Sequence, residues 1–102
     1  MLKHIVMWKL KDFAEGASRA ENAQKLKALL LSCADLTPGT LKFEVALASD
    51  GLEATYDVVL YSEFSDKAAL DAYQSHPEHV KIKDFIGAVR QERQCMDYLS
   101  GE

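Results

Sequence analysis

The sequence predicts an α+β domain built on a four-stranded antiparallel sheet, and three observations lead to this class. Four segments alternate in apolar residues with the period of a strand, other stretches repeat at three and four residues as helices do, and turn signals separate them. The predicted order is strand, helix, strand, strand, helix, strand, which is the β-α-β-β-α-β order of ferredoxin-like folds. The length of 102 residues suits one such domain over residues 1–102.

The first half of the chain predicts a strand followed by a helix. Residues 2–11 alternate with apolar side chains on both faces, so we expect a strand that is covered on both sides. Ser18 and Glu21 have the spacing of a capping box, in which side chains satisfy free backbone amides at a helix start. Thr37-Pro38-Gly39 ends the helical pattern, because proline cannot continue a helix and glycine permits the turn.

The second half predicts two strands joined by a hairpin, two short helices and a final strand. Residues 41–48 and 55–64 alternate on either side of the turn signal Asp50-Gly51. Ser65 is the predicted cap of the first short helix, and Pro77 opens the second. Residues 90–98 alternate loosely, and we expect them at or near a sheet edge.

Helices on one face would leave the other face of this sheet bare. A bare face with alternating apolar residues marks an interface, and the chain has no further element to cover it. A second copy of the sheet is the simplest cover. We therefore expect a homodimer joined through its sheet faces, in the form of a dimeric α+β barrel.

Composition and charge exclude several classes of function. The 12 Lys and Arg are outnumbered by 16 Asp and Glu, so nucleic acid is not an expected partner. The apolar runs are far shorter than a membrane span, which predicts a cytoplasmic protein with no membrane contact. Cys33 and Cys95 lack metal or redox spacing and are predicted to be reduced packing residues. We expect no cofactor and no metal, since nucleotide motifs are missing and the three histidines have no completing ligand.

Two histidines and a tyrosine carry the predicted chemistry. His79 lies on the apolar stripe of the last helix, where a histidine can move a proton near neutral pH. With His79 as the base, Tyr73 as a hydrogen-bond donor and His4 on the opposite wall, proton abstraction beside a carbonyl needs no cofactor. The predicted substrate-binding residues are Val6, Trp8, Ile82 and Ile86. The alternative from packing alone is that His79 is a core residue bonded to a backbone carbonyl, and His76 is expected to cap its helix.

Two segments of the chain resemble a known family. They run from Lys3 to Asp12 and from Tyr73 to Val80, and the run His76-Pro77-Glu78-His79-Val80 is the most specific part. Together with Asp97-Tyr98 they resemble the stress-responsive A/B barrel (Dabb) family, the dimeric α+β barrel domain, over nearly the whole chain. The resemblance implies a ferredoxin-like dimer. Plant members include a polyketide cyclase that performs an aldol condensation, and His79, Tyr73 and His4 match its pocket positions, although the first helix here lacks the aromatic residues of that pocket.

Three functions fit these observations. The first is a homodimeric protein that binds a small apolar or aromatic carbonyl compound and acts through His79 as a cofactor-free cyclase, lyase or isomerase. The second is a noncatalytic stress-response, ligand-binding or structural domain, so the sequence leaves open whether the chain is an enzyme. The third is a cofactor-free monooxygenase, a chemistry of other dimeric α+β barrels. A cavity on the order of several hundred Å³ beside His79 would favour the first or third function over the second.

Overall fold

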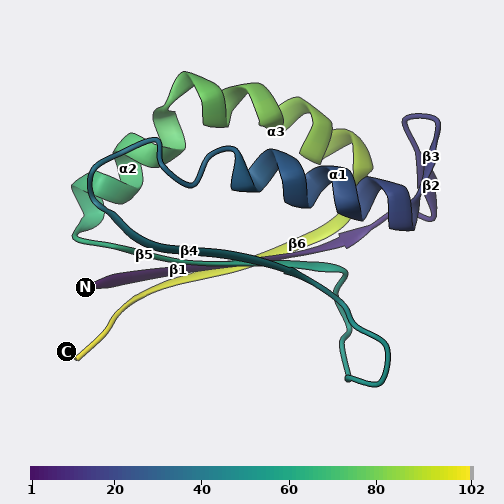
Figure 1. Ribbon diagram of the computed structural model, residues 1–102, viewed down its shortest axis with the longest axis horizontal. Coiled ribbons are helices and arrows are strands. Elements are labelled where there is room, and N and C mark those ends of the chain that lie inside the picture. The colour runs from purple at the N-terminus through teal and green to yellow at the C-terminus, as the bar shows by residue number, and fades with distance from the viewer. Residues whose placement is uncertain (102) are drawn as a thin grey trace.

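The computed structural model describes residues 1–101 and contains a four-stranded antiparallel sheet with helices on one face (Figure 1). The sheet order is β4-β5-β1-β6, with β1 at Leu2–Leu10, β4 at Thr40–Leu47, β5 at Val58–Phe64 and β6 at Arg90–Leu99. The helices are α1 at Arg19–Leu31, α2 at Lys67–Ser75 and α3 at Pro77–Val89. This confirms the predicted ferredoxin-like order. Glu102, which belongs to the predicted 1–102 domain, lies outside the described residues.

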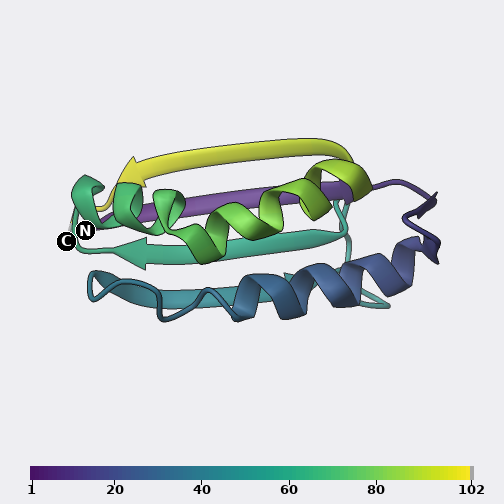
Figure 2. The same ribbon diagram turned by 90° about the horizontal axis from the view of Figure 1, so that it is seen from above.

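The helix layer covers the sheet unevenly. Figure 2 shows α1 above β4 and α3 above the central strands, while β6 runs along the edge with little helix above it. All ten residues of β6 are exposed, whereas β5 and β1 alternate between buried and partly buried positions. The predicted edge position of the last strand is therefore confirmed.

The two faces of β1 have different surroundings. Its helix-side residues, Leu2, His4, Val6, Trp8 and Leu10, are buried in the core. The residues between them remain partly exposed on the face without helices. The predicted cover on both sides of β1 is thus present on one side only in the single chain, because no described element crosses the other face.

The predicted start of α1 is confirmed in atomic detail. The Glu21 backbone N–H donates to Ser18 Oγ over 3.2 Å, and the Ser18 N–H donates to Glu21 Oε1 over 3.1 Å. This reciprocal pair is the capping box expected from the spacing. The helix buries Ala23, Leu26 and Leu30 against the sheet, as their spacing predicts.

Three local predictions need correction. Asp66, not Ser65, caps α2, since Asp66 Oδ1 accepts from the Ala69 N–H over 2.9 Å while the Ser65 N–H donates to the Gly39 carbonyl. The sequence predicted a strand followed by a helix with no strand between them, but a small hairpin of β2 (Phe13–Ala14) and β3 (Ala17–Ser18) lies between β1 and α1. The strand expected from residue 55 begins at Val58, and residues 48–57 form a long loop on the open side of the sheet (Figure 1).

Gly39 lies where the backbone approaches α2 closely, and this gives a stability prediction. A Cβ at Gly39 would lie 2.4 Å from the Ala69 Cβ and 2.8 Å from Ser65 Oγ. Because the Ala69 Cβ cannot rotate away, we expect Gly39→Ala to lower the free energy of unfolding by about 1–3 kcal/mol in urea titrations. Gly87→Ala is the matched control: its Cβ would meet no atom within 4 Å, and a helical Gly→Ala change should stabilise by about 0.5–1 kcal/mol. Equal stability of the two variants would contradict the clash.

No helix among residues 1–101 is both long and apolar enough to cross a membrane.

Candidate functional site

A cavity of about 330 Å³ lies under α3 and against the helix-side face of the sheet. Five predicted site residues line it: His4, Val6, Trp8, His79 and Ile86. The other lining residues are Leu30, Leu60, Gln74, Lys83, Gly87, Arg90 and Arg93. Tyr73 and Ile82, which were also predicted for the site, are buried core residues outside this lining. The cavity is therefore lined by apolar side chains together with polar and charged ones.

His79 presents a nitrogen that can accept a proton. Its Nδ1–H donates to the Gln74 carbonyl over 3.0 Å, because a carbonyl can only accept, and Nε2 then keeps its lone pair. Burial lowers the pKa of His79 below its ordinary 6.5, the bond to Gln74 opposes this shift, and the nearby charge of Lys83 adds to it. The ring is therefore neutral near pH 7, which is the state a general base needs.

The carbonyl bond of His79 is the contact that the packing interpretation expected. That interpretation alone does not account for the ring lining a cavity as well. The same bond would also fix the tautomer of a histidine that acts as a base. The bond is therefore compatible with a packing role and with a catalytic role for His79.

His4 forms a pair with an acidic residue that the sequence reasoning did not assign to the site. Asp97 on β6 lies directly opposite His4 on β1, and the His4 Nδ1 is 2.5 Å from Asp97 Oδ1. A carboxylate in this position holds the orientation of the imidazole ring. The sequence offered two signals, which are the alternation of the first and last segments and the Asp97-Tyr98 run of the family resemblance. Neither signal shows the antiparallel register that brings His4 and Asp97 together.

Tyr73 packs behind the histidines. Its ring centroid lies 4.6 Å from that of His79 and 6.5 Å from that of His4, and its side chain is completely buried. The hydroxyl has no hydrogen-bond partner within residues 1–101, and burial raises the pKa of Tyr73 above its usual 10. The group is consequently a neutral phenol with a free O–H to donate.

The remaining sequence candidates have structural roles. His76 caps α3, where its Nδ1 accepts from the Glu78 N–H over 3.1 Å, as predicted. Cys33 is buried, as predicted for a packing residue, whereas Cys95 is exposed on β6, so its predicted packing role is wrong for the single chain; both are free thiols. Among the described residues, no group of three or more His, Cys, Asp or Glu side chains is arranged to hold a metal ion.

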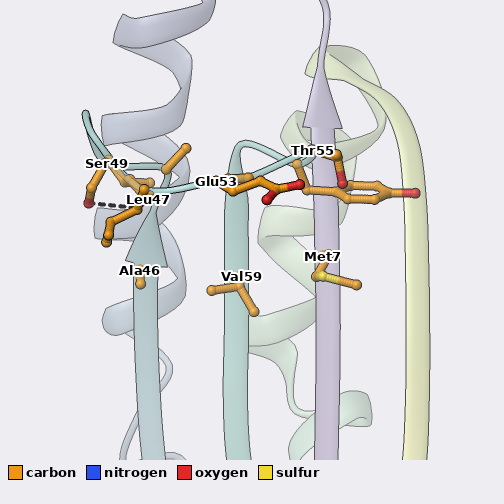
Figure 3. Close-up of a pocket in the computed structure, with 11 residues that line it drawn as sticks. Met7, Ala46, Leu47, Ser49, Glu53, Thr55 and Val59 are labelled. Carbon is orange, nitrogen blue, oxygen red and sulfur yellow. Dashed lines mark hydrogen bonds between the residues drawn. The ribbon is translucent and has the colours of Figure 1, made fainter.

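A second hollow of about 590 Å³ lies on the opposite side of the sheet (Figure 3). The loop 48–57 forms one wall, and the open sheet face contributes Met7, Ala46 and Val59. Glu53 is the one charged residue in its lining, and the histidines lie on the other side of the sheet. Its chemistry suits packing against another surface better than proton transfer.

Fold and site together define a class of protein: a ferredoxin-like α+β domain with a histidine-lined cavity between its helices and its sheet. Residues 2–100 match the family described as Stress responsive A/B Barrel Domain, or Dabb. The chain belongs to this family, which confirms the resemblance found in the sequence.

Solved structures of similar chains support the fold. A dimeric ferredoxin-like protein of unknown function from Bacteroides fragilis is 28% identical, with a TM-score of 0.78 over 97% of this chain and 95% of its own. A Dabb family protein from Mesorhizobium loti is 22% identical, with a TM-score of 0.72 over 97% and 95%. A putative antibiotic biosynthesis monooxygenase from Nitrosomonas europaea is 16% identical, with a TM-score of 0.73 and complete coverage of both chains (100% each). No curated protein matches the chain significantly.

Proposed function

We propose that this protein is a cofactor-free acid–base enzyme that removes and returns a proton beside the carbonyl group of a small molecule. The observation that carries the proposal is the state of His79: a neutral imidazole with a free Nε2 at the wall of a cavity of about 330 Å³. A cavity of this volume is within the range of small-molecule sites, at roughly 300–1,000 Å³.

The proposed step is an enolisation. His79 Nε2 takes a proton from the carbon next to the carbonyl, and the electron pair of that C–H bond moves to form the carbon–carbon double bond of an enolate. The negative charge develops on the carbonyl oxygen, and the donor assigned to it from the sequence is the hydroxyl of Tyr73, which lies behind the cavity lining. Return of the proton from His79, to the same or to another carbon, completes an isomerase, lyase or cyclase reaction. Support for Tyr73 comes from the packing of its ring against that of His79 and from its hydroxyl, which has no hydrogen-bond partner within residues 1–101.

The pair formed by His4 and Asp97 supplies a second positioned imidazole. Since Nδ1 of His4 is engaged by Asp97, its Nε2 is the atom that can contact a bound molecule. We assign His4 to orienting the substrate from the β1 wall, as the sequence suggested. Val6, Trp8 and Ile86 would contact the apolar body of the substrate, and Ile82 would support them from the core.

Two other functions are weighed against this proposal. A noncatalytic stress-response or binding domain would use the same cavity, and the bond from His79 to Gln74 is compatible with it. A cofactor-free monooxygenase is suggested only by neighbours at 16% and 20% identity, and such a likeness supports the fold alone.

The proposal includes a homodimer joined through the open sheet faces, in a cytoplasmic setting. The open face carries Ile5, Met7, Val59, Met96 and Tyr98, and Met96 is 65% exposed in the single chain. Similar proteins from Bacteroides fragilis and Jannaschia, at 28% and 27% identity, are described as dimeric. The hollow beneath the loop 48–57 would receive side chains of the second copy (Figure 3).

The test of the acid–base function is a pH profile of proton exchange. We expect the protein to exchange the methyl protons of para-acetylphenylpropanoate, an aromatic methyl ketone with a carboxylate arm, for deuterium in D₂O, as followed by NMR. Because burial lowers the pKa of His79, its basic form persists below pH 6.5. We therefore expect the exchange rate to reach half its maximum at a pH below 6.5 and to stay constant at higher pH.

The charged and titratable groups around His79 bear on this profile. They are His4 on β1, Tyr73 on α2, Lys83 on α3, and Arg93 and Asp97 on β6. Burial is the largest cause of the lowered pKa of His79, and the charges of Lys83 and Arg93 act in the same direction. Exchange no faster than with an equal concentration of free imidazole would refute the proposal.

A further inference from the structure

The cavity carries cations that the proton transfer does not use. Lys83, Arg90 and Arg93 all line it, and within residues 1–101 none of them forms an ion pair. The Arg93 guanidinium donates from Nη1 to Cys95 Sγ over 3.4 Å, a contact that leaves its charge uncompensated. By contrast, Lys67 and Lys81 on the outer helix surface each bind a carboxylate. In a chain with a net charge of −4, where acids outnumber bases, three unpaired cations around one cavity create a local positive field that attracts anions.

A buried donor without a partner lies beside these cations. Trp8 is 3% exposed and lines the cavity, yet its indole Nε1–H has no acceptor among residues 1–101. Arg93 is the residue directly opposite Trp8 in the β1–β6 pairing. A buried N–H without an acceptor costs about 1–3 kcal/mol, so a ligand oxygen in the cavity would remove a real penalty.

The polar groups of the cavity lie at two separate ends. His4 pairs with Asp97 and Trp8 pairs with Arg93, and the four-residue step between them spans ~13 Å of strand. His79 lies at the same end as His4, because the ring of Tyr73 packs against both histidines. The opposite end of α3 lies beside the end of β1, where the Lys11 N–H donates to the Val89 carbonyl over 2.9 Å (Figure 2).

We propose that the substrate of this cavity is a carboxylate-bearing carbonyl compound, bound with its carboxylate on Arg93, Arg90 and the Trp8 indole N–H and its carbonyl at the His79 end. The placement of the carbonyl rests on the proposed function; the anionic end rests on the unpaired cations and on Trp8. A guanidinium fork matches a planar carboxylate in two parallel hydrogen bonds. Lys83, one turn beyond His79 on α3, lies between the two ends and adds to the field.

The surroundings favour a carboxylate over a phosphate. Arg90 follows the C-terminus of α3, whose backbone carbonyls carry partial negative charge and disfavour a dianion.

The volume of the cavity limits the size of the ligand. A cavity of ~150 Å³ accommodates benzene, so about 330 Å³ has room for one substituted ring with a short arm.

The test compares two probes of the same shape and different charge. Binding of para-acetylphenylpropanoate and of its neutral amide, para-acetylphenylpropanamide, is measured by NMR titration of the whole protein. We expect the acid to bind about tenfold or more tightly than the amide, since hydrogen bonds to charged groups are the stronger ones. The preference should shrink when the ionic strength is raised from about 0.05 to about 0.5 M.

Arg93→Gln should weaken acid binding about tenfold and change amide binding less than about twofold. Arg19→Gln is the matched control, since Arg19 is an exposed arginine that pairs with Asp12 away from the cavity. Both substitutions are at exposed positions, so we expect both variants to fold. The dispersion of the backbone amide signals in their NMR spectra checks this. Equal binding of acid and amide, no binding of either, an equal effect of Arg19→Gln, or displacement of the acid by equimolar inorganic phosphate would overturn the inference.

This test is independent of turnover. If the acid binds as expected but its methyl protons do not exchange, the inference stands and the acid–base function fails. If the amide binds as tightly as the acid and both exchange, the function stands and the inference is overturned.

Discussion

His79→Ala is expected to slow methyl-proton exchange of para-acetylphenylpropanoate by ~100-fold or more while the protein stays folded. A positioned general base contributes roughly 10²–10⁴-fold, and the change removes the nitrogen that accepts the proton. The His79 ring is only partly buried, so its loss leaves the buried core of α3 in place. Exchange rates are measured by NMR at saturating probe, and unfolding is followed by circular dichroism in urea.

The chain contains its own matched control for this experiment. His76 belongs to the same motif and the same helix end, but its ring accepts from the Glu78 N–H and does not line the cavity. His76→Ala should cost about 1 kcal/mol of stability through the lost cap and leave the exchange rate unchanged. An unaltered rate in His79→Ala, or an equal loss in both variants, would remove His79 from the mechanism.

Val59→Asp is expected to convert a dimer into a monomer. Val59 lies on the open sheet face and lines the hollow of about 590 Å³ beneath the loop 48–57 (Figure 3). A carboxylate there would be buried without a partner in a sheet-to-sheet interface, at a cost of several kcal/mol. Light scattering at micromolar concentration should give twice the chain mass of 11.4 kDa for the wild type and the single mass for the variant.

Val80→Asp controls for the chemistry of the substitution. Val80 is 47% exposed on α3, on the helix side of the molecule, so the same change there should leave the dimer intact. Circular dichroism separates dissociation from unfolding. A monomeric wild type would refute the homodimer, and a dimeric Val59→Asp variant would show that the copies meet at another surface.

The sequence determined much of the fold because its signals are local. The capping box of Ser18 and Glu21 acts over three residues, and Pro77 fixes the start of α3 through its own ring. The burial of alternate residues in β1 follows from the two-residue period of a strand. Ser65 was predicted to cap α2, but the cap is its neighbour Asp66, and the Ser65 N–H is bonded instead to the distant Gly39 carbonyl.

Some residues of the candidate site were predicted from local sequence signals, and others were found only in the structure. The motif around His79 and the pattern of β1 identified His4, Trp8 and His79, and all three line the cavity. Asp97 and Arg93 were not assigned to the site, because their positions opposite His4 and Trp8 depend on the register between the first and last strands. That register is fixed by the packing of the sheet and leaves no mark in either segment.

What the sequence by itself determined is the order of the elements, the face that each buries and the family to which the chain belongs. Only the tertiary structure decided which groups meet: the His4–Asp97 pair, the buried hydroxyl of Tyr73 and the unpaired cations beside Trp8. The physical reason is range. Helix caps, turns and strand periods act between residues a few positions apart, whereas a site draws together side chains that are 93 residues apart in the chain, as His4 and Asp97 are.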